Sequence, residues 1–95
     1  MGKQLRTARH KALMVALYAA RMRAGMTQRE LAKRLNRSHS FVGKIESGER
    51  QLNVLEFCEI ADALELDATE LLAMIIHPTL PVPSGGRRRS RTGAS

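Results

Sequence analysis

Tryptophan is absent from the 95-residue sequence, and aromatic residues make up only 3% of it. With so few rings, we expect a core of aliphatic side chains. The single cysteine, Cys58, cannot form an internal disulfide and has no Cys or His at ligand spacing, so neither a disulfide framework nor a metal site is expected. The longest uncharged apolar run, Ala12–Ala20, is far below the roughly 20 residues that a membrane span needs. These absences favour a cytoplasmic protein without a membrane segment or cofactor.

Proline is confined to the end of the chain, where all three prolines follow His77. Residues 77–95 read HPTLPVPSGGRRRSRTGAS, which offers few side chains that could pack in a core. We therefore predict a disordered basic tail. Its arginines can neutralise phosphates without reading a sequence, and a role in solubility alone is the alternative. They are Arg87, Arg88, Arg89 and Arg91.

Acidic residues are scarce in the first half of the sequence. Residues 1–50 hold 12 Lys or Arg against 3 Asp or Glu, residues 51–76 hold six acidic residues and no basic one, and the tail adds four arginines. These segments carry net charges of +9, −6 and +4. A chain with one positive and one negative half can dock its positive face on a polyanion. Nucleic acid is the leading expected partner.

Helical periodicity and capping signals recur five times along the sequence, without strand alternation. Capping boxes are predicted at Thr27 with Glu30, Asn53 with Glu56, and Asp67 with Glu70. We predict helices near residues 7–24, 28–35, 39–46, 54–64 and 68–76. The expected fold is all-α, a compact five-helix domain over residues 10–76. Residues 1–9 are expected to form a basic arm or the start of the first helix.

The segment TQRELAKRLNRSHSFVGKIESGERQLNVLEFCEIADALELDATELL resembles the helix-turn-helix domain of the XRE family, which includes the phage Cro and lambda-type repressors. The resemblance covers about residues 10–76. A helix-turn-helix needs a small residue where its helices cross, a turn residue that tolerates positive φ, and apolar anchors for the second helix. The residues that carry the likeness are Gln28, Ala32, Leu35, Asn36 (where glycine is commoner), Val42 and Ile45.

The resemblance implies that the helix near residues 39–46 enters the major groove of double-stranded DNA. The residues that it places against base edges are Ser38, His39, Ser40, Gly43 and Lys44. Lys44 can donate to guanine O6 or N7. The expected phosphate contacts, at the helix termini around the groove, are Gln28, Arg37, Ser47, Arg50 and Gln51. The glutamine-rich form of this helix in phage repressors is absent, so their operators do not transfer.

Several of these residues have a structural alternative. Ser38 is equally suited to cap the third helix. The role expected of Gly43 is different from a side-chain contact, because the absence of a side chain allows a close approach to DNA. Arg37 and Arg50 have the alternative of being solvated surface charges. Phe41 is assigned to packing against the loop after the third helix, in preference to a DNA contact. The resemblance also implies a structural ion pair, between Arg21 and Glu46.

The expected function is that of a sequence-specific double-stranded DNA-binding transcription regulator, most simply a repressor that binds an inverted-repeat operator as a homodimer. The alternative is an antitoxin or restriction-system controller protein, which binds a protein partner as well as its own promoter. No enzyme is expected, since the sequence has no Gly-rich phosphate-binding loop and no nucleophilic side chain paired with a general base. Two apolar surfaces could form the dimer, one on the first helix around Tyr18 and one on the fifth around Leu72.

Overall fold

Five helices account for most of residues 7–78, which are the residues that the computed structural model describes. They are α1 (Ala8–Arg23), α2 (Gln28–Arg34), α3 (Ser40–Glu46), α4 (Val54–Ala63) and α5 (Ala68–Ile76). This part of the chain contains no strand, so the all-α prediction is confirmed. Ala8 and Arg9 belong to α1. The rest of the expected arm, residues 1–6, and the predicted tail from residue 79 onward lie outside the described residues.

Side chains cap four of these helices. At α2, the Thr27 hydroxyl accepts from the Glu30 N–H at 3.0 Å and the Glu30 carboxylate accepts from the Thr27 N–H at 2.8 Å, which confirms the predicted capping box. Asn53 and Glu56 form the second predicted box at α4. At α5 the Asp67 carboxylate accepts instead from the Thr69 N–H, one residue before the position predicted from the box with Glu70. The caps satisfy backbone donors at the helix N-termini.

α3 begins without a side-chain cap. Its N-cap position is His39, which has helical backbone angles (φ −56°, ψ −34°), and the helix itself starts at Ser40. The interpretation of Ser38 as the N-cap is therefore wrong, because Ser38 lies one residue too early. Its carbonyl accepts from the Phe41 N–H at 3.1 Å, so a tight backbone turn leads into the helix.

Positive φ angles mark the turns that follow the first four helices. Gly25 (φ 73°), Asn36 (φ 60°) and Gly48 (φ 86°) follow α1, α2 and α3, as their residue types indicate. Glu65 (φ 59°) takes the same conformation after α4. No signal in the sequence points to it, because glutamate seldom adopts this conformation. The turns at Asn36 and Glu65 join helices that pack against each other, α2 with α3 and α4 with α5.

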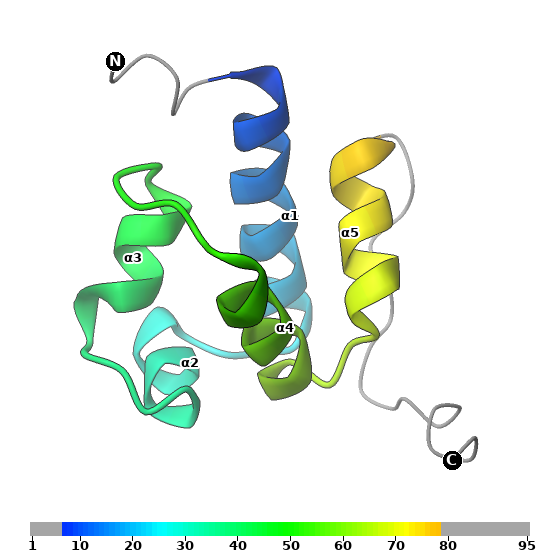
Figure 1. The fold of residues 1–95 in the computed structure, drawn as a ribbon. Coiled ribbons are helices and arrows are strands. Elements are labelled where there is room, and N and C mark those ends of the chain that lie inside the picture. The colour runs from blue at the N-terminus through cyan, green and yellow to red at the C-terminus, as the bar shows by residue number, and fades with distance from the viewer. Residues whose placement is uncertain (1–6, 79–95) are drawn as a thin grey trace.

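The core lies where the helices meet, and it is aliphatic as predicted. Ala32 and Ala61 have no exposed surface, and Ile45 and Leu71 are the largest fully buried side chains. Phe41 is the one buried aromatic residue within the described part of the chain. In Figure 1, α1 runs through the centre with α5 beside it on one side and α2 and α3 on the other, while α4 lies across the front. This arrangement leaves one long side of α3 at the surface.

Candidate nucleic-acid interface

α2 packs against α3, and Ala32 of α2 has a small, fully buried side chain that allows the two helices to approach closely. After the turn at Asn36 the chain returns to α2, where the Ala32 carbonyl accepts from the Arg37 N–H at 2.9 Å. Val42 and Ile45 anchor the inner face of α3 in the core. The second helix is thus held from inside and open on its outer face, which is the arrangement that a helix-turn-helix needs.

The outer face of α3 carries the residues predicted to contact bases. Ser38, His39, Ser40 and Lys44 are exposed, and Gly43 is half-buried. Ser40, Gly43 and Lys44 are spaced by three and four positions, so they share one side of the helix. That side has hydrogen-bond donors and no carboxylate, which suits it to the acceptor-rich edges of bases.

Gly43 is half-buried because the side chain of Gln28 lies over it. A Cβ at position 43 would lie 3.2 Å from Oε1 and 3.7 Å from Cδ of Gln28. The sequence suggested that this glycine allows a close approach to DNA. The structure adds a reason within the fold, since any larger residue at this position would press on the first residue of α2.

Arg21 and Glu46 are joined by two hydrogen bonds. Arg21 donates from Nε to Oε2 of Glu46 at 2.7 Å and from Nη2 to Oε1 at 3.0 Å, and both side chains are only 7% exposed. The pKa of Arg21 is raised, mainly by this hydrogen bonding with Glu46. Nη1 of Arg21 donates to the Met26 carbonyl at 2.8 Å, and Gln28 donates from Nε2 to Oε1 of Glu46 at 2.9 Å. One carboxylate at the end of α3 therefore connects it to α1 and α2.

A second cluster, which the sequence did not indicate, surrounds Phe41. The guanidinium groups of Arg37 and Arg50 lie 4.5 Å and 4.9 Å from the centroid of its ring. Arg50 donates to both carboxylate oxygens of Glu56 at 2.9 Å, and Arg37 donates to Oε2 at 3.4 Å. Arg37 and Arg50 are therefore not simply solvated charges. We call Arg37, Phe41, Arg50 and Glu56 the Phe41 cluster.

Glu56 is the acidic centre of the Phe41 cluster and is 7% exposed. Its pKa is lowered to about 2, chiefly by the hydrogen bonds from Arg50 and then by that from the Asn53 backbone. The same hydrogen bonding raises the pKa of Arg50. A glutamate at the third position of a capping box is expected at the surface. In the sequence, only Arg50, six residues before Glu56, could have indicated that this carboxylate is buried in an ion pair.

The other expected phosphate contacts lie at the ends of α2 and α3. Gln28 is exposed at the first position of α2, and Ser47 is exposed at the C-cap of α3. The Ser47 hydroxyl donates to the Lys44 carbonyl at 3.1 Å. Gln51 is exposed in the segment that leads to α4. Gln28 and Ser47 therefore lie at helix ends next to the outer face of α3, where phosphates of a bound duplex would lie. Gln51 instead lines a hollow between α1, the start of α4 and α5, so the structure does not bring it together with the other two.

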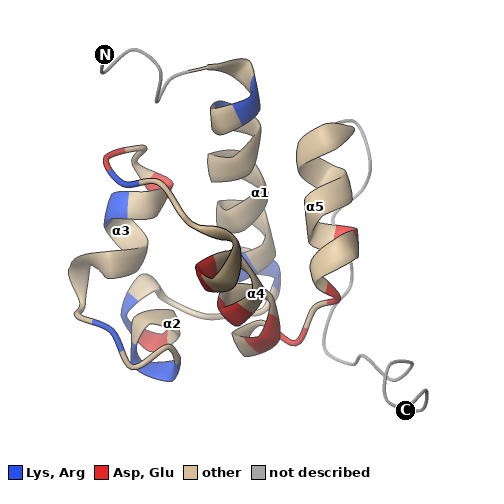
Figure 2. Ribbon diagram, in the orientation of Figure 1, with Lys and Arg blue, Asp and Glu red and all other residues tan. Residues whose placement is uncertain are grey.

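Charges are segregated in space as they are in the sequence. Figure 2 shows acidic residues on α4, in the turn into α5 and on α5, with others on α2 and around the end of α3, whereas Lys and Arg lie on α1, α2, α3 and the turns beside them. Six of the nine acidic residues lie in residues 51–76, on α4, α5 and the turn between them, and not on α3. A field of this direction would orient the protein with α3 toward a polyanion.

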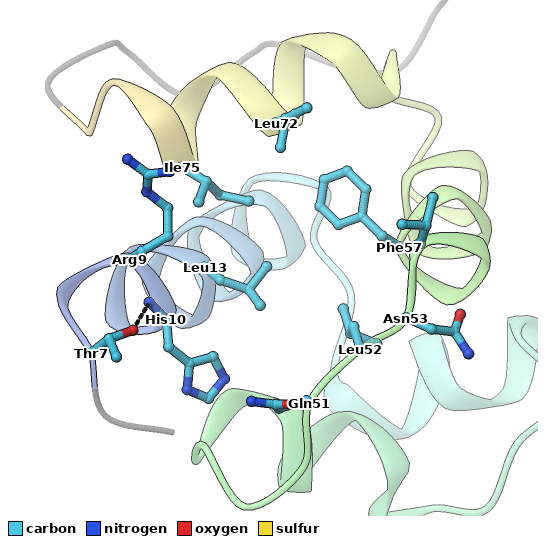
Figure 3. A pocket seen from close by; sticks show the side chains of 11 residues that line it. Thr7, Arg9, His10, Leu13, Gln51, Leu52, Asn53, Phe57, Leu72 and Ile75 are labelled. Atoms are coloured by element: carbon cyan, nitrogen blue, oxygen red, sulfur yellow. Dashed lines mark hydrogen bonds between the residues drawn. The ribbon is translucent and has the colours of Figure 1, made fainter. Parts of the chain in front are cut away.

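A hollow of about 460 Å³ lies between α1, the segment before α4, and α5. Figure 3 shows Leu13, Phe57 and Leu72 around it, and no residue of α2 or α3 contributes to its lining. Val54 and Leu72 at this hollow are 75% and 45% exposed. A separate group of exposed apolar side chains lies on α1, at Val15, Tyr18 and Met22.

Residues 7–78 contain neither a candidate metal centre nor a helix that could cross a membrane. No group of three or more His, Cys, Asp or Glu side chains in this range could hold a metal ion. The helices of the same range lack the length and hydropathy to cross a membrane.

Fold and site together define a helix-turn-helix protein. A family model described as helix-turn-helix matches residues 17–71, more than half of the chain. The chain is also similar to a solved structure, an XRE-family like protein from Pseudomonas syringae pv. tomato, with 42% identity over 82% of this chain and 95% of that one, and a TM-score of 0.71. No curated protein matches.

The protein belongs to the XRE family of helix-turn-helix proteins. It is thus a DNA-binding transcription regulator. The resemblance inferred from Gln28, Ala32 and Asn36 is confirmed at the level of the family.

Proposed function

We propose that the protein is a repressor that binds an inverted-repeat operator as a homodimer. The observation that carries this proposal is the outer face of α3, where Ser40 and Lys44 are exposed beside Gly43 without any carboxylate on that face. Such a face can enter a major groove and donate hydrogen bonds to base edges. A protein that occupies promoter DNA in this way blocks polymerase without any further activity.

Individual roles follow from position. Lys44 is the principal base-reading residue, because its flexible ammonium group can reach guanine O6 and N7. His39 and Ser40 read the adjacent base pair. Gln28 and Ser47 bind phosphates beside the groove and fix the register of α3.

A homodimer supplies the specificity that one short helix lacks. α3 has seven residues, so a single copy contacts only a few base pairs. Two copies related by a two-fold axis read two half-sites about one helical turn apart, which explains the expectation of an inverted repeat. The exposed apolar side chains at the hollow offer a surface for the second copy.

The test is selection of binding sites from a random duplex library at physiological salt, with Lys44→Ala as the variant. The native protein should enrich a two-fold symmetric site, and Lys44→Ala should lose about 1–3 kcal/mol of discrimination at one base pair in each half-site. Lys33→Ala, which removes an exposed positive charge from α2, is the matched control and should weaken all duplexes alike.

Two results would count against the proposal. Weak, salt-sensitive binding without sequence preference would favour the antitoxin or controller alternative, in which a protein partner completes recognition. Discrimination that survives Lys44→Ala would show that α3 does not lie in the groove as proposed.

A further inference from the structure

We propose that Glu56 is a positioning residue for DNA recognition, which holds Arg37 and Arg50 against Phe41 and so withholds both arginines from phosphates. This inference rests on the proposed function and revises the expected phosphate contacts. It makes the Phe41 cluster the device that sets the orientation of the N-terminal half of α3.

The geometry places the cluster across both chain segments that flank the recognition helix. Arg37 lies before α3 and Arg50 after it, yet both guanidinium groups contact the same ring, at 4.5 Å and 4.9 Å from its centroid. Phe41 belongs to the first turn of α3 and is 7% exposed. Two cations that share one carboxylate therefore contact this ring, and a cation over a ring face is a favourable arrangement of charge.

Glu56 has the hydrogen bonds to carry this role. Its Oε1 accepts from Nη1 of Arg50 at 2.9 Å and from the Asn53 N–H at 3.1 Å, and its Oε2 accepts from Nη2 of Arg50 at 2.9 Å and from Arg37 at 3.4 Å. A two-bond contact between a guanidinium and a carboxylate fixes both groups in a plane. Because the Asn53 bond closes the capping box of α4, the cluster is anchored to the start of that helix.

Arg37 and Arg50 are partly exposed, but both already have partners with which a phosphate would have to compete. Arg50 also donates to the Gln51 carbonyl at 3.0 Å, and Nη2 of Arg37 lies 3.7 Å from the Glu59 carboxylate. A phosphate would have to compete with a buried carboxylate that stays ionised throughout the neutral range. Removing that charge should therefore change affinity and discrimination in opposite directions.

Glu56→Gln is the informative variant, because glutamine can still complete the capping box but carries no charge for the arginines. Freed arginines should strengthen binding to a scrambled duplex and steepen the log–log salt dependence by up to about 1.8, the contribution of two phosphates. The loosened α3 should lose about tenfold in preference for the selected operator, which corresponds to one base contact. A loss of folded protein would instead weaken binding to both duplexes.

Glu59→Gln is the matched control. It lies on the same helix and removes the same charge, but its side chain is 57% exposed and meets only Arg37, at 3.7 Å. It should raise affinity for both duplexes slightly and leave their ratio unchanged. If Glu59→Gln and Glu56→Gln behave alike, the effect is one of net charge and the inference is wrong.

Arg50→Gln separates the two roles of this arginine. If Arg50 binds a phosphate, the salt dependence should become shallower by about 0.9. On our inference the slope stays at the native value while operator preference falls by about tenfold. The slopes are measured on a scrambled duplex with the full chain, so they test the inference even if no operator is found, whereas the selection experiment alone tests the proposed function.

Discussion

The side-chain amide of Gln28 lies directly over Gly43, between α2 and α3. A Cβ at position 43 would be only 3.2 Å from Oε1 of Gln28. The amide is held from its other side by Glu46, which accepts from Nε2 at 2.9 Å. The first residue of α2 is thus fixed by contacts with two residues of α3. Its expected phosphate contact depends on this position.

Gly43→Ala should therefore weaken operator binding by about 1 kcal/mol, a value typical of one displaced polar contact. The free energy of unfolding should change by less than about 1 kcal/mol, because alanine favours the helix over glycine by a similar amount and offsets the tight contact. Titration of a labelled operator and urea unfolding measure the two quantities.

The control is the pair Gln28→Ala and Gln28→Ala with Gly43→Ala. Once the amide is gone, the alanine at position 43 meets nothing on that side, so the second substitution should add no further loss of affinity. An equal loss in both backgrounds would mean that the methyl group acts on DNA directly and not through Gln28.

Much of the fold could be predicted because its signals are local. Thr27 with Glu30 and Asn53 with Glu56 are capping boxes in the sequence and in the structure, and Asn36 takes the left-handed turn expected of it. Such features depend on residues a few positions apart, so periodicity and residue type are enough. The turn at Glu65 was missed because glutamate seldom has a positive φ, although the turn itself is closed by a local backbone bond from the Leu66 N–H to the Ala61 carbonyl at 2.8 Å.

The candidate site was less predictable, because its contacts join distant parts of the chain. The pair of Arg21 and Glu46 could be expected only from the resemblance to a family, since 25 residues separate them. Nothing in the sequence shows that Glu56 faces Arg37 and Arg50, because a carboxylate in a capping box is usually solvated. The missing cap at Ser38 has a different, local cause, since a backbone turn from Ser38 to Phe41 leads into α3 without a side-chain bond.

Glu46→Ala should destabilise the fold by about 3 kcal/mol, because it leaves the guanidinium of Arg21 buried without its carboxylate. The guanidinium of Arg21 would keep the hydrogen bond to the Met26 carbonyl and its contact with the Tyr18 ring but no carboxylate, and Gln28 would lose its acceptor as well. Urea unfolding followed by circular dichroism measures the effect. Glu49→Ala, which removes an exposed carboxylate three residues later, should change stability by less than about 0.5 kcal/mol. Equal effects of the two variants would show that the ion pair does not hold α3.

The free energy of unfolding should depend on pH in the acidic range because Glu56 has a lowered pKa in the folded protein. Hydrogen bonds from Arg50 and Asn53 lower its pKa from 4.5 to about 2, so the folded protein binds a proton at this carboxylate less readily than the unfolded chain does. A lowered pKa stabilises the fold above the unfolded value, and this contribution is lost as the pH falls from about 4.5 through about 2.

Comparison with Glu56→Gln isolates this contribution, because glutamine does not titrate and the remaining carboxylates are common to both proteins. The difference in free energy of unfolding should be constant from pH 7 to about 5 and should shrink toward pH 2. Urea unfolding at a series of pH values gives the curve. A difference that stays the same down to pH 2.5 would mean that Arg50 and Glu56 are not paired in solution.

The second copy of the chain should cover the hollow and not the apolar group on α1. Val54 and Leu72 lie together at the hollow, and Ile76, which is 44% exposed, lies one turn beyond Leu72 on α5. On α1 the ring of Tyr18 is already in contact with a cation, since the guanidinium of Arg21 lies 5.4 Å from its centroid.

Leu72→Lys should therefore convert the dimer into a monomer, because it buries a charge at the interface. Tyr18→Lys adds the same charge elsewhere and should leave the dimer intact. Sedimentation velocity of both variants decides between the surfaces: dissociation by Tyr18→Lys alone would assign the interface to α1, and a native protein that is monomeric even on operator DNA would contradict the homodimer itself.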